Sequence, residues 1–218
     1  MHSAYRKRSC HWSLTKLRGV AIIFVLLRYK GMKKWMLVAV LLLPLLGRAQ
    51  DYDFAKKIGG NTLYFYITST GGKNGATVEV TYPGASEEEP WKGFSRPSGQ
   101  LSIPEKVTPD RAKGRHADPE DDDTTIYTVT SINYCAFSGC DRITRLVIPA
   151  TVKQVGESAF AGCKRIEYIV VEASQPPRMD ESAFDQVDLD IPLRVPPGTY
   201  EKYKEAVGWR MFTEILEY

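Results

Sequence analysis

Histidine and cysteine are scarce in this sequence of 218 residues, which holds three of the first and four of the second. Only His116 lies beyond residue 49, and a zinc site or a Ser-His-Asp triad is hard to assemble around a single histidine. Carboxylates are plentiful, yet no spacing among them singles out a pair of the kind that glycoside hydrolases use. The sequence therefore predicts no catalytic residues, no metal site and no cofactor.

Acidic residues are absent from positions 1–49, where ten Lys and Arg occur. Residues 50–218 therefore hold 19 Lys and Arg against 26 Asp and Glu, a formal net charge of −7. Nucleic-acid binding needs a basic surface that neutralises phosphates. The acidic balance of residues 50–218 argues against a nucleic acid as the partner.

No apolar run in the sequence reaches the roughly 20 residues that span a bilayer. Met32 opens a Met-Lys-Lys start, the apolar run Trp35–Leu46 follows, and Gly47-Arg48-Ala49 comes next. This succession is typical of a secretory signal peptide. We expect cleavage after Ala49, and no Cys follows at that point to carry a lipid anchor. No stable membrane insertion is then expected after cleavage.

A second, shorter apolar run, Gly19–Leu27, lies upstream between basic residues. We interpret residues 1–49 as the leader, with Met32 as the preferred start of translation. The alternative is that both runs insert together and anchor the chain, which the basic residues between them oppose. The cleaved protein is expected to be extracytoplasmic, that is, secreted, periplasmic or at the cell surface.

A repeat is the strongest pattern in the sequence. The pair Ala-Phe recurs at Ala136-Phe137, Ala159-Phe160 and Ala183-Phe184, with spacings of 23 and then 24 residues. A period in this range predicts successive coils, each of which buries its apolar side against its neighbours. We therefore expect like residues to stack at the spacing of strands in a sheet. The three expected ladders are Leu146, Ile169 and Leu193; Ile148, Val171 and Val195; and Phe137, Phe160 and Phe184.

One polar column interrupts these ladders. Asn133, Gly156 and Asp180 share a position in the repeat, and these three residue types tolerate positive φ. The column predicts a left-handed corner in each coil. A short helical turn that carries the Ala-Phe pair is expected to follow the corner.

The full pattern is apolar-x-x-apolar-x-Ile-Pro-x-x-Val-x-x-Val-Gly-x-x-Ala-Phe-x-x-Cys, clearest over residues 127–174 and looser to Val195. It resembles the BspA-like, or Treponema-type, leucine-rich repeat of bacterial surface proteins. The ending from Val195 to Tyr200, the motif Gly208–Phe212 and the strand-rich stretch 60–104 also resemble parts of that family. The resemblance implies secreted or surface-exposed proteins that act in adhesion and protein binding without enzymatic activity. This chain has about three coils where many relatives have far more.

The segments on either side of the repeats predict two caps. Thr62–Thr68 and Ala76–Tyr82 are β-rich runs separated by the turn Gly71–Gly75, which predicts a hairpin. A hairpin there would cover the open edge of the first coil. At the other end Tyr200–Val207 predicts a helix. Its expected inner face is Tyr200, Tyr203 and Val207, and Trp209, Phe212 and Ile215 are expected to fold back on the last coil.

The predicted fold is a β-rich leucine-rich-repeat solenoid with short helical turns, about three coils, an N-terminal β-hairpin cap and a C-terminal helical cap. The charged stretch that precedes the first coil shows no periodicity, which predicts a mobile loop. The expected segments are the leader (1–49), the N-terminal β-rich cap (50–104), the charged loop (105–125), the leucine-rich repeats (126–198) and the C-terminal helical cap (199–218).

The acidic run Asp118–Asp123 and the cysteines each have two interpretations. The run could bind calcium but lacks the spacing of a calcium loop, so a solvated charge run is favoured. Cys140 and Cys163 lie one coil apart, near the disulfide range, but Val187 fills the next rung, which favours buried free thiols. Cys135 aligns with serines in the other coils and is expected to be partly exposed.

The candidate binding surface is the outward face of the parallel strands, because alternate residues of a strand leave the core. Arg and Tyr are enriched at binding hot spots, although an ordinary mixed sheet face is the simpler interpretation. A second aromatic group, Tyr64, Tyr66, Tyr82 and Trp91, could stack on sugars or peptides, but some of these rings must fill the cap. The candidate residues are Arg145, Val147, Tyr168, Val170 and Arg194, beside Pro192.

The sequence favours a secreted or surface-exposed, non-enzymatic binding module for a protein or glycan partner. A structural subunit of a surface assembly is the alternative, and a carboxylate-dependent glycan hydrolase is the third hypothesis.

Overall fold

The computed structural model describes residues 25–27, 36–38, 52–71, 75–109 and 125–218. The chain divides into two compact units, Met1–Gly47 and Arg48–Tyr218. In the first unit, β1 (Val25–Leu27) pairs antiparallel with β2 (Met36–Val38). The rest of the predicted leader and the cleavage point after Ala49 lie outside the described residues. Within those residues there is no helix long and apolar enough to cross a membrane.

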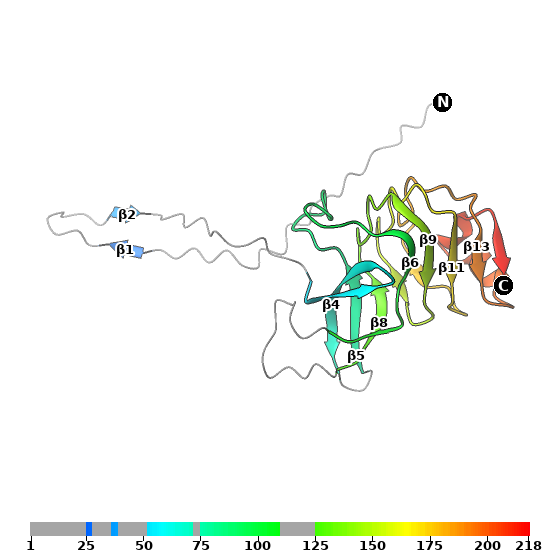
Figure 1. Ribbon diagram of the computed structural model, residues 1–218, viewed down its shortest axis with the longest axis horizontal. Helices are drawn as coiled ribbons and strands as arrows, with labels where there is room; N and C mark the ends of the chain where they lie inside the picture. The colour runs from blue at the N-terminus through cyan, green and yellow to red at the C-terminus, as the bar shows by residue number, and fades with distance from the viewer. Residues whose placement is uncertain (1–24, 28–35, 39–51, 72–74, 110–124) are drawn as a thin grey trace, which may run out of the picture. The chain divides into compact units, whose positions relative to one another are not determined.

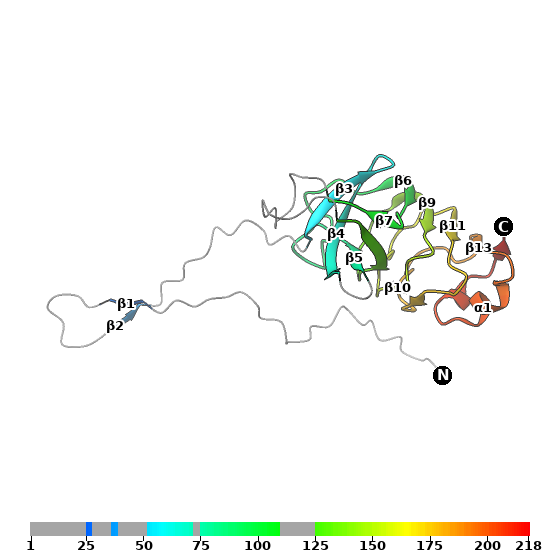
Figure 2. The ribbon, with the colours of Figure 1, turned by 90° about the horizontal axis from the view of Figure 1, so that it is seen from below.

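The second unit is built from two sheets, as Figure 1 and Figure 2 show. The large sheet has seven strands and the small sheet has five. The large sheet comprises β3 (Phe54–Ile58), β4 (Asn61–Thr70), β5 (Ala76–Thr81), β7 (Lys106–Val107), β8 (Tyr127–Ile132), β10 (Gln154–Val155) and β12 (Arg178–Met179). The small sheet comprises β6 (Ser98–Ser102), β9 (Arg142–Ile148), β11 (Tyr168–Val171), β13 (Leu193–Val195) and β14 (Ile215–Glu217).

Within the repeats, successive strands alternate between the two sheets. In the large sheet β8, β10 and β12 pair in parallel, and in the small sheet β9, β11 and β13 do the same. Leu146 lies opposite Ile169, and Ile169 lies opposite Leu193. All three side chains are fully buried, so the first predicted ladder is confirmed.

The parallel strands do not stand alone as a solenoid, because both sheets extend beyond the repeats. The predicted hairpin is present as β4 and β5, which pair antiparallel, and β5 then pairs in parallel with β8. Four further strands were not predicted: β3 pairs with β4, β6 pairs in parallel with β9, β14 pairs in parallel with β13, and β7 pairs antiparallel with β8. Strand β7 lies within the stretch 105–125 that was expected to be a loop. The fold is thus strand-rich, with few helical residues.

An aromatic column runs through the core between the sheets. Phe137 stacks on Phe160 with ring centroids 5.3 Å apart, and Phe160 stacks on Phe184 at 5.0 Å. A tryptophan meets each end of this Phe ladder: Trp91 stacks on Phe137 at 6.2 Å, and Trp209 lies 6.3 Å from Phe184. The predicted Phe ladder is therefore confirmed, and it is longer than the repeat itself.

The predicted left-handed corner at Asn133, Gly156 and Asp180 is wrong. Positive φ occurs two residues later instead, at Cys135 (φ 53°) and Ser158 (φ 53°). Gly156 is needed for a different reason, which is lack of space. A Cβ there would lie 2.6 Å from the Tyr134 amide nitrogen and 2.9 Å from the Asn133 carbonyl carbon of the neighbouring coil.

The segments that carry the Ala-Phe pairs are hydrogen-bonded turns rather than the predicted helical turns. The first two of these turns also bond to the next coil. The Phe137 amide donates to the Ala159 carbonyl at 2.7 Å, and the Phe160 amide donates to the Ala183 carbonyl at 2.8 Å. These bonds satisfy the buried backbone that the tight turns leave without a partner within the coil.

The C-terminal segment begins with α1 (Tyr200–Glu205) and the 3-10 helix η1 (Trp209–Met211). Tyr203 is buried, but Tyr200 and Val207 are exposed, so the predicted inner face of the helix is wrong for these two. Trp209 and Phe212 are buried against Phe184, as expected. The short helix turns only one side chain inward, and the aromatic residues after it cover the last coil.

Candidate binding surface

The five predicted residues lie together on the outward side of the small sheet. Arg145 lies opposite Tyr168 in the pairing of β9 with β11. Val147 lies opposite Val170, which in turn lies opposite Arg194 of β13. Their neighbours along each strand point into the core, since Leu146, Ile169 and Leu193 have no exposed surface.

Tyr168 lies between two arginines, one from each neighbouring strand. The guanidinium carbon of Arg145 is 5.5 Å from the centre of the Tyr168 ring, and that of Arg194 is 4.6 Å away. A cation within about 6 Å of a ring centre is attracted by the electrons of the ring face. The Tyr168 ring therefore attracts a guanidinium group from each neighbouring strand, while both arginine residues remain exposed.

One acidic group also lies near this cluster. The Arg145 Nε is 4.0 Å from a Glu167 carboxylate oxygen, and both side chains are about half exposed or more, at 48% and 62%. An exposed pair at this distance contributes little to stability. The pair leaves the Arg145 guanidinium available to another carboxylate.

Arg194 also belongs to a mixed row that crosses the same face of the small sheet. Ser102 of β6 lies opposite Val147, and Arg194 lies opposite Leu216 of β14. Leu216 is 42% exposed, so the apolar residues Val147 and Val170 lie on one side of Arg194 and Leu216 lies on the other. The repeat pattern did not indicate Ser102 or Leu216, because both come from strands outside the repeat, where the spacing of 23 or 24 residues is no guide.

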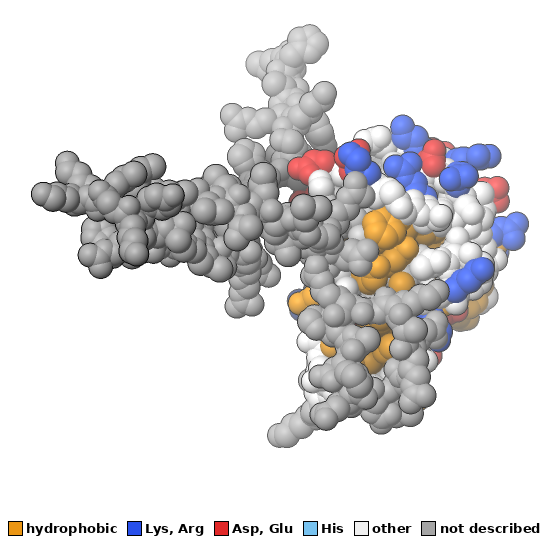
Figure 3. All heavy atoms as spheres, turned by 60° about the vertical axis from the view of Figure 1, so that its left-hand side comes forward, with side chains coloured by type: hydrophobic (Ala, Val, Ile, Leu, Met, Phe, Trp, Pro, Cys, Tyr) orange, Lys and Arg blue, Asp and Glu red, His pale blue; other side chains and the backbone are white. Residues whose placement is uncertain are grey.

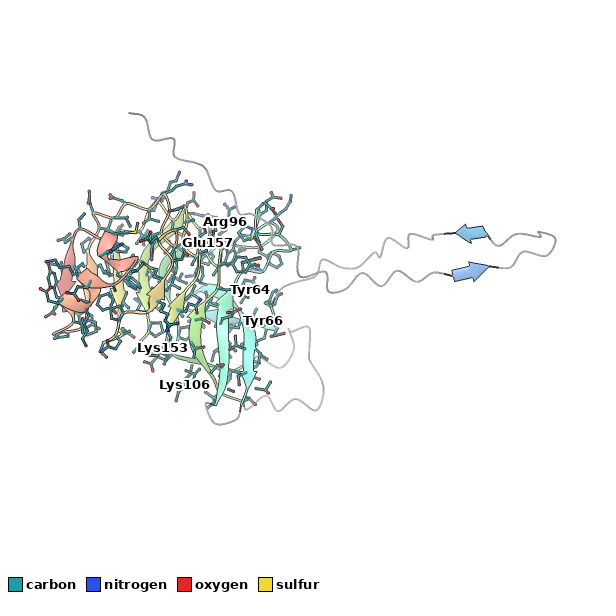
Figure 4. The ribbon with its side chains drawn as sticks, turned by 180° about the vertical axis from the view of Figure 1, so that it is seen from behind. Tyr64, Tyr66, Arg96, Lys106, Lys153 and Glu157 are labelled. Atoms are coloured by element: carbon teal, nitrogen blue, oxygen red, sulfur yellow. The ribbon has the colours of Figure 1, made fainter. Side chains whose placement is uncertain are left out.

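Of the second aromatic group, only one ring remains on the surface. Tyr64, Tyr82 and Trp91 are buried, while Tyr66 is 47% exposed. Tyr64 and Tyr66 both belong to β4, where Figure 4 labels them. The Trp91 indole nitrogen donates to the Ala136 carbonyl at 3.2 Å, so this ring is part of the core.

The other residues that could bind a metal ion lie partly outside and partly within the described part of the chain. His116 and the acidic run Asp118–Asp123 lie outside the described residues. Within the described part of the chain, no group of three or more His, Cys, Asp or Glu could hold a metal ion. In Figure 3 the largest visible hydrophobic area lies near the middle of the described surface, and the charged side chains, mostly Lys and Arg, lie mainly along the upper and right-hand edges.

Cys140 and Cys163 are free thiols, and all three described cysteines are buried. This confirms the expectation for Cys140 and Cys163 and corrects it for Cys135, which was expected to be partly exposed. Burial raises the pKa of the Cys140 thiol far above its usual range, and it raises the pKa of Cys163 to about 12. The Cys163 thiol also donates to the Phe137 carbonyl at 3.2 Å.

Residues 123–192 match the model of the BspA type leucine rich repeat region, in six copies. The repeats are of the BspA type. The BspA-type region contains four of the five candidate residues, and Arg194 lies two residues beyond the match. Proteins with BspA-type repeats are typically found at the cell surface or secreted and are typically non-enzymatic.

Solved structures of leucine-rich repeat proteins are similar to this chain at low identity. One from Bacteroides capillosus ATCC 29799 is 18% identical, with 75% of this chain and 98% of that chain covered and a TM-score of 0.39. One from Bacteroides ovatus ATCC 8483 is 22% identical, with 76% and 37% covered and a TM-score of 0.39. A leucine rich cell surface protein from Faecalibacterium prausnitzii A2-165 is 16% identical, with 77% and 33% covered and a TM-score of 0.36. The chain thus spans little more than a third of the length of the second and a third of the third. No curated protein matches the chain.

Proposed function

We propose that the protein is a secreted or surface-exposed, non-enzymatic binding module whose small sheet binds a protein partner that presents carboxylate groups. The observation that carries this proposal is the placement of Arg145 and Arg194 over one Tyr168 ring. Each guanidinium group that is held by the ring can bind a carboxylate with paired, charge-assisted hydrogen bonds. The apolar side chains of Val147, Val170 and Leu216, on either side of Arg194, supply contact area that a protein interface needs beside such charges.

A neutral sugar suits this surface less well than a protein. Sugars stack on exposed aromatic faces, but the guanidinium groups of Arg145 and Arg194 already lie over Tyr168. A stacking sugar would have to displace at least one of them and lose its attraction to the ring. Carboxylates of a protein can instead bind from outside without moving either arginine.

We also propose that the architecture comprises about three coils closed at both ends. The support is that β5 pairs with the first repeat strand of the large sheet, and that Trp209 and Phe212 lie against Phe184 of the last coil. Such contacts cover apolar surface that the first and last coils of a short stack would otherwise expose. The charged leader before Trp35 and the surface location typical of BspA-type proteins support export.

The proposed role of the small sheet is tested by capture of surface and extracellular proteins from the natural environment. The wild-type protein and the double variant Arg145→Ala/Arg194→Ala are immobilised, and the affinity of each for the captured proteins is measured at several salt concentrations. We expect the variant to bind at least about tenfold more weakly, since each paired charge at an interface contributes on the order of 1.4 kcal/mol or more. Wild-type affinity should also fall with salt.

A matched control removes two positive charges elsewhere. Lys57 and Lys204 are exposed and lie outside the small sheet, so Lys57→Ala/Lys204→Ala should bind like the wild type. Equal capture by both double variants would reject the small sheet as the binding surface.

Self-association through β14 is a second candidate function. This strand is an edge of the small sheet, and its Leu216 is 42% exposed. An open edge with an exposed apolar residue can pair with another chain, which a structural subunit would use. Light scattering on the purified protein tests this: an oligomer that Leu216→Lys dissociates supports it, and a monomer at high concentration rejects it.

A further inference from the structure

A row of polar side chains crosses the large sheet on its outward side. Each member is flanked in its own strand by a core residue, as Glu79 is by Val78 and Val80, which have no exposed surface. The strand pairings place the five members opposite one another in sequence. The row is Tyr66 (β4), Glu79 (β5), Ser131 (β8), Gln154 (β10) and Arg178 (β12).

Glu79 is the member with the most constrained environment. It is partly buried, and one carboxylate oxygen accepts a hydrogen bond from the Asn133 amide at 2.9 Å. The Ser131 hydroxyl lies 3.5 Å from the other oxygen. Burial raises the pKa of Glu79, opposed by the Ser131 hydrogen bond. Among the described residues no cation pairs with it, so a carboxylate with about four acceptor positions keeps some of them unused.

Tyr66 supplies the aromatic surface next to this carboxylate. It lies directly opposite Glu79 in the pairing of β4 with β5, and it is 47% exposed. Within the described residues its ring makes no aromatic or cation contact, in contrast to Tyr168 on the small sheet. An exposed ring face beside a carboxylate therefore lies at one end of the row.

We propose that this row binds a neutral glycan, with Tyr66 stacking on the apolar face of one sugar ring and Glu79 accepting hydrogen bonds from its hydroxyl groups. Ser131 and Gln154 follow Glu79 in the row, and both donate and accept hydrogen bonds, as hydroxyl groups of sugars require. Neighbouring strands lie about 4.8 Å apart, so the five members span about 19 Å. The row thus offers polar contacts to several successive sugar units.

The charges of the row favour a neutral ligand. Glu79 and Arg178 have opposite signs and lie three strands apart, so the row has no excess of either charge. A nucleic acid would need several cations. An extended peptide pairs with a sheet edge, whereas β5 and β8 have strands on both sides. A sugar with vicinal hydroxyl groups fits both the unused acceptor positions of Glu79 and the free face of Tyr66.

Titration of the full protein with a panel of neutral oligosaccharides from plant, fungal and animal glycans tests the proposal. We expect at least one class to bind, and Tyr66→Ala and Glu79→Gln each to lower its affinity by about tenfold or more, as loss of a central contact does. Tyr66→Phe should retain binding within about threefold, because the ring is kept. Thermal melting checks that each variant is folded.

Two controls separate this surface from other effects. Thr68 is exposed on the same strand as Tyr66, and Thr68→Ala should leave glycan affinity unchanged. Tyr168→Ala on the small sheet should do the same, so the outcome is independent of the proposed protein-binding surface. The proposal is overturned if no neutral glycan binds, if folded Tyr66→Ala and Glu79→Gln bind like the wild type, or if Thr68→Ala and Tyr66→Ala lose affinity equally.

Discussion

The ring of Phe160 stacks on that of Phe184, with centroids 5.0 Å apart and ring planes 12° from parallel. The same pair of coils is joined by a backbone bond from the Phe160 amide to the Ala183 carbonyl. Side-chain stacking and backbone pairing therefore have the same register. Because each repeat buries its Phe only through its neighbours, the stability of the coils is shared along the column.

Removal of the central ring should destabilise the whole unit. Phe160 has no exposed surface, and Phe160→Ala is expected to lower the free energy of unfolding by about 3–5 kcal/mol, because it leaves a cavity between two rings. Phe94, which is only partly buried, provides the control. Urea denaturation of Phe160→Ala and Phe94→Ala measures the difference, and similar losses would contradict the central role of the column.

Substitutions at Gly156 distinguish lack of space from backbone conformation. A Cβ would lie 2.6 Å from the Tyr134 amide nitrogen, so Gly156→Ala should cost about 1–3 kcal/mol by overpacking. Asn tolerates a left-handed backbone better than Ala does, but it brings the same Cβ. We therefore expect Gly156→Asn to melt at least as early as Gly156→Ala, and Gly156→Val earlier still. A clearly higher melting temperature for Gly156→Asn than for Gly156→Ala would instead support a left-handed backbone at Gly156.

The stability of Glu79→Gln should depend on pH. Burial raises the pKa of Glu79 in the folded protein, so the folded state holds this proton more tightly than the unfolded state does. The contribution of Glu79 to stability therefore falls as pH rises from below the unfolded pKa to above the folded pKa. Gln carries no charge and still accepts from Asn133.

Melting curves at two pH values test this expectation. Glu79→Gln should melt at a higher temperature than the wild type at pH 7, and the gain should vanish near about pH 3, where both side chains are neutral. The exposed Glu157 provides a control, since Glu157→Gln should change little at either pH. A gain that persists at low pH would point to a cause other than charge burial.

The buried thiols should be unreactive in the native protein. The pKa of Cys140 is raised far above its usual range and that of Cys163 to about 12, in both cases mainly by burial, so almost no thiolate forms at pH 8. A thiol reagent should label neither cysteine until denaturant is added. Ser174→Cys, at an exposed position, should react at once. Rapid labelling of native Cys140, or a disulfide found by mass spectrometry, would contradict the packing described above.

The repeat could be predicted because the number of residues in each coil fixes which residues of successive coils lie opposite one another. Coils of 23 and 24 residues bring Leu146, Ile169 and Leu193 to equivalent positions, and apolar residues at equivalent positions are buried together. For the same reason the five residues of the small-sheet surface could be named, since they occupy the alternate, outward positions of those strands. The outward position of Tyr168 follows from the repeat; its contact with Arg194 depends on the side-chain conformations.

The polar row of the large sheet could not be predicted from the sequence. Tyr66 and Glu79 come from before the repeats, and the pairing of β5 with β8 shifts register between Val78 and Glu79. Such a shift breaks the alternation by which outward residues are counted. Strand β6 likewise gives no periodic signal before it pairs with β9.

The sequence by itself determined which residues stack from coil to coil, because a regular period leaves only one register that buries every apolar residue. Tertiary structure alone decided what lies beside the coils and how closely. The Asn133 amide reaches Glu79, 54 residues away, and Gly156 is required by the backbone of the coil before it. These contacts depend on which separate segments of the chain meet in the fold, and the local sequence pattern does not indicate that.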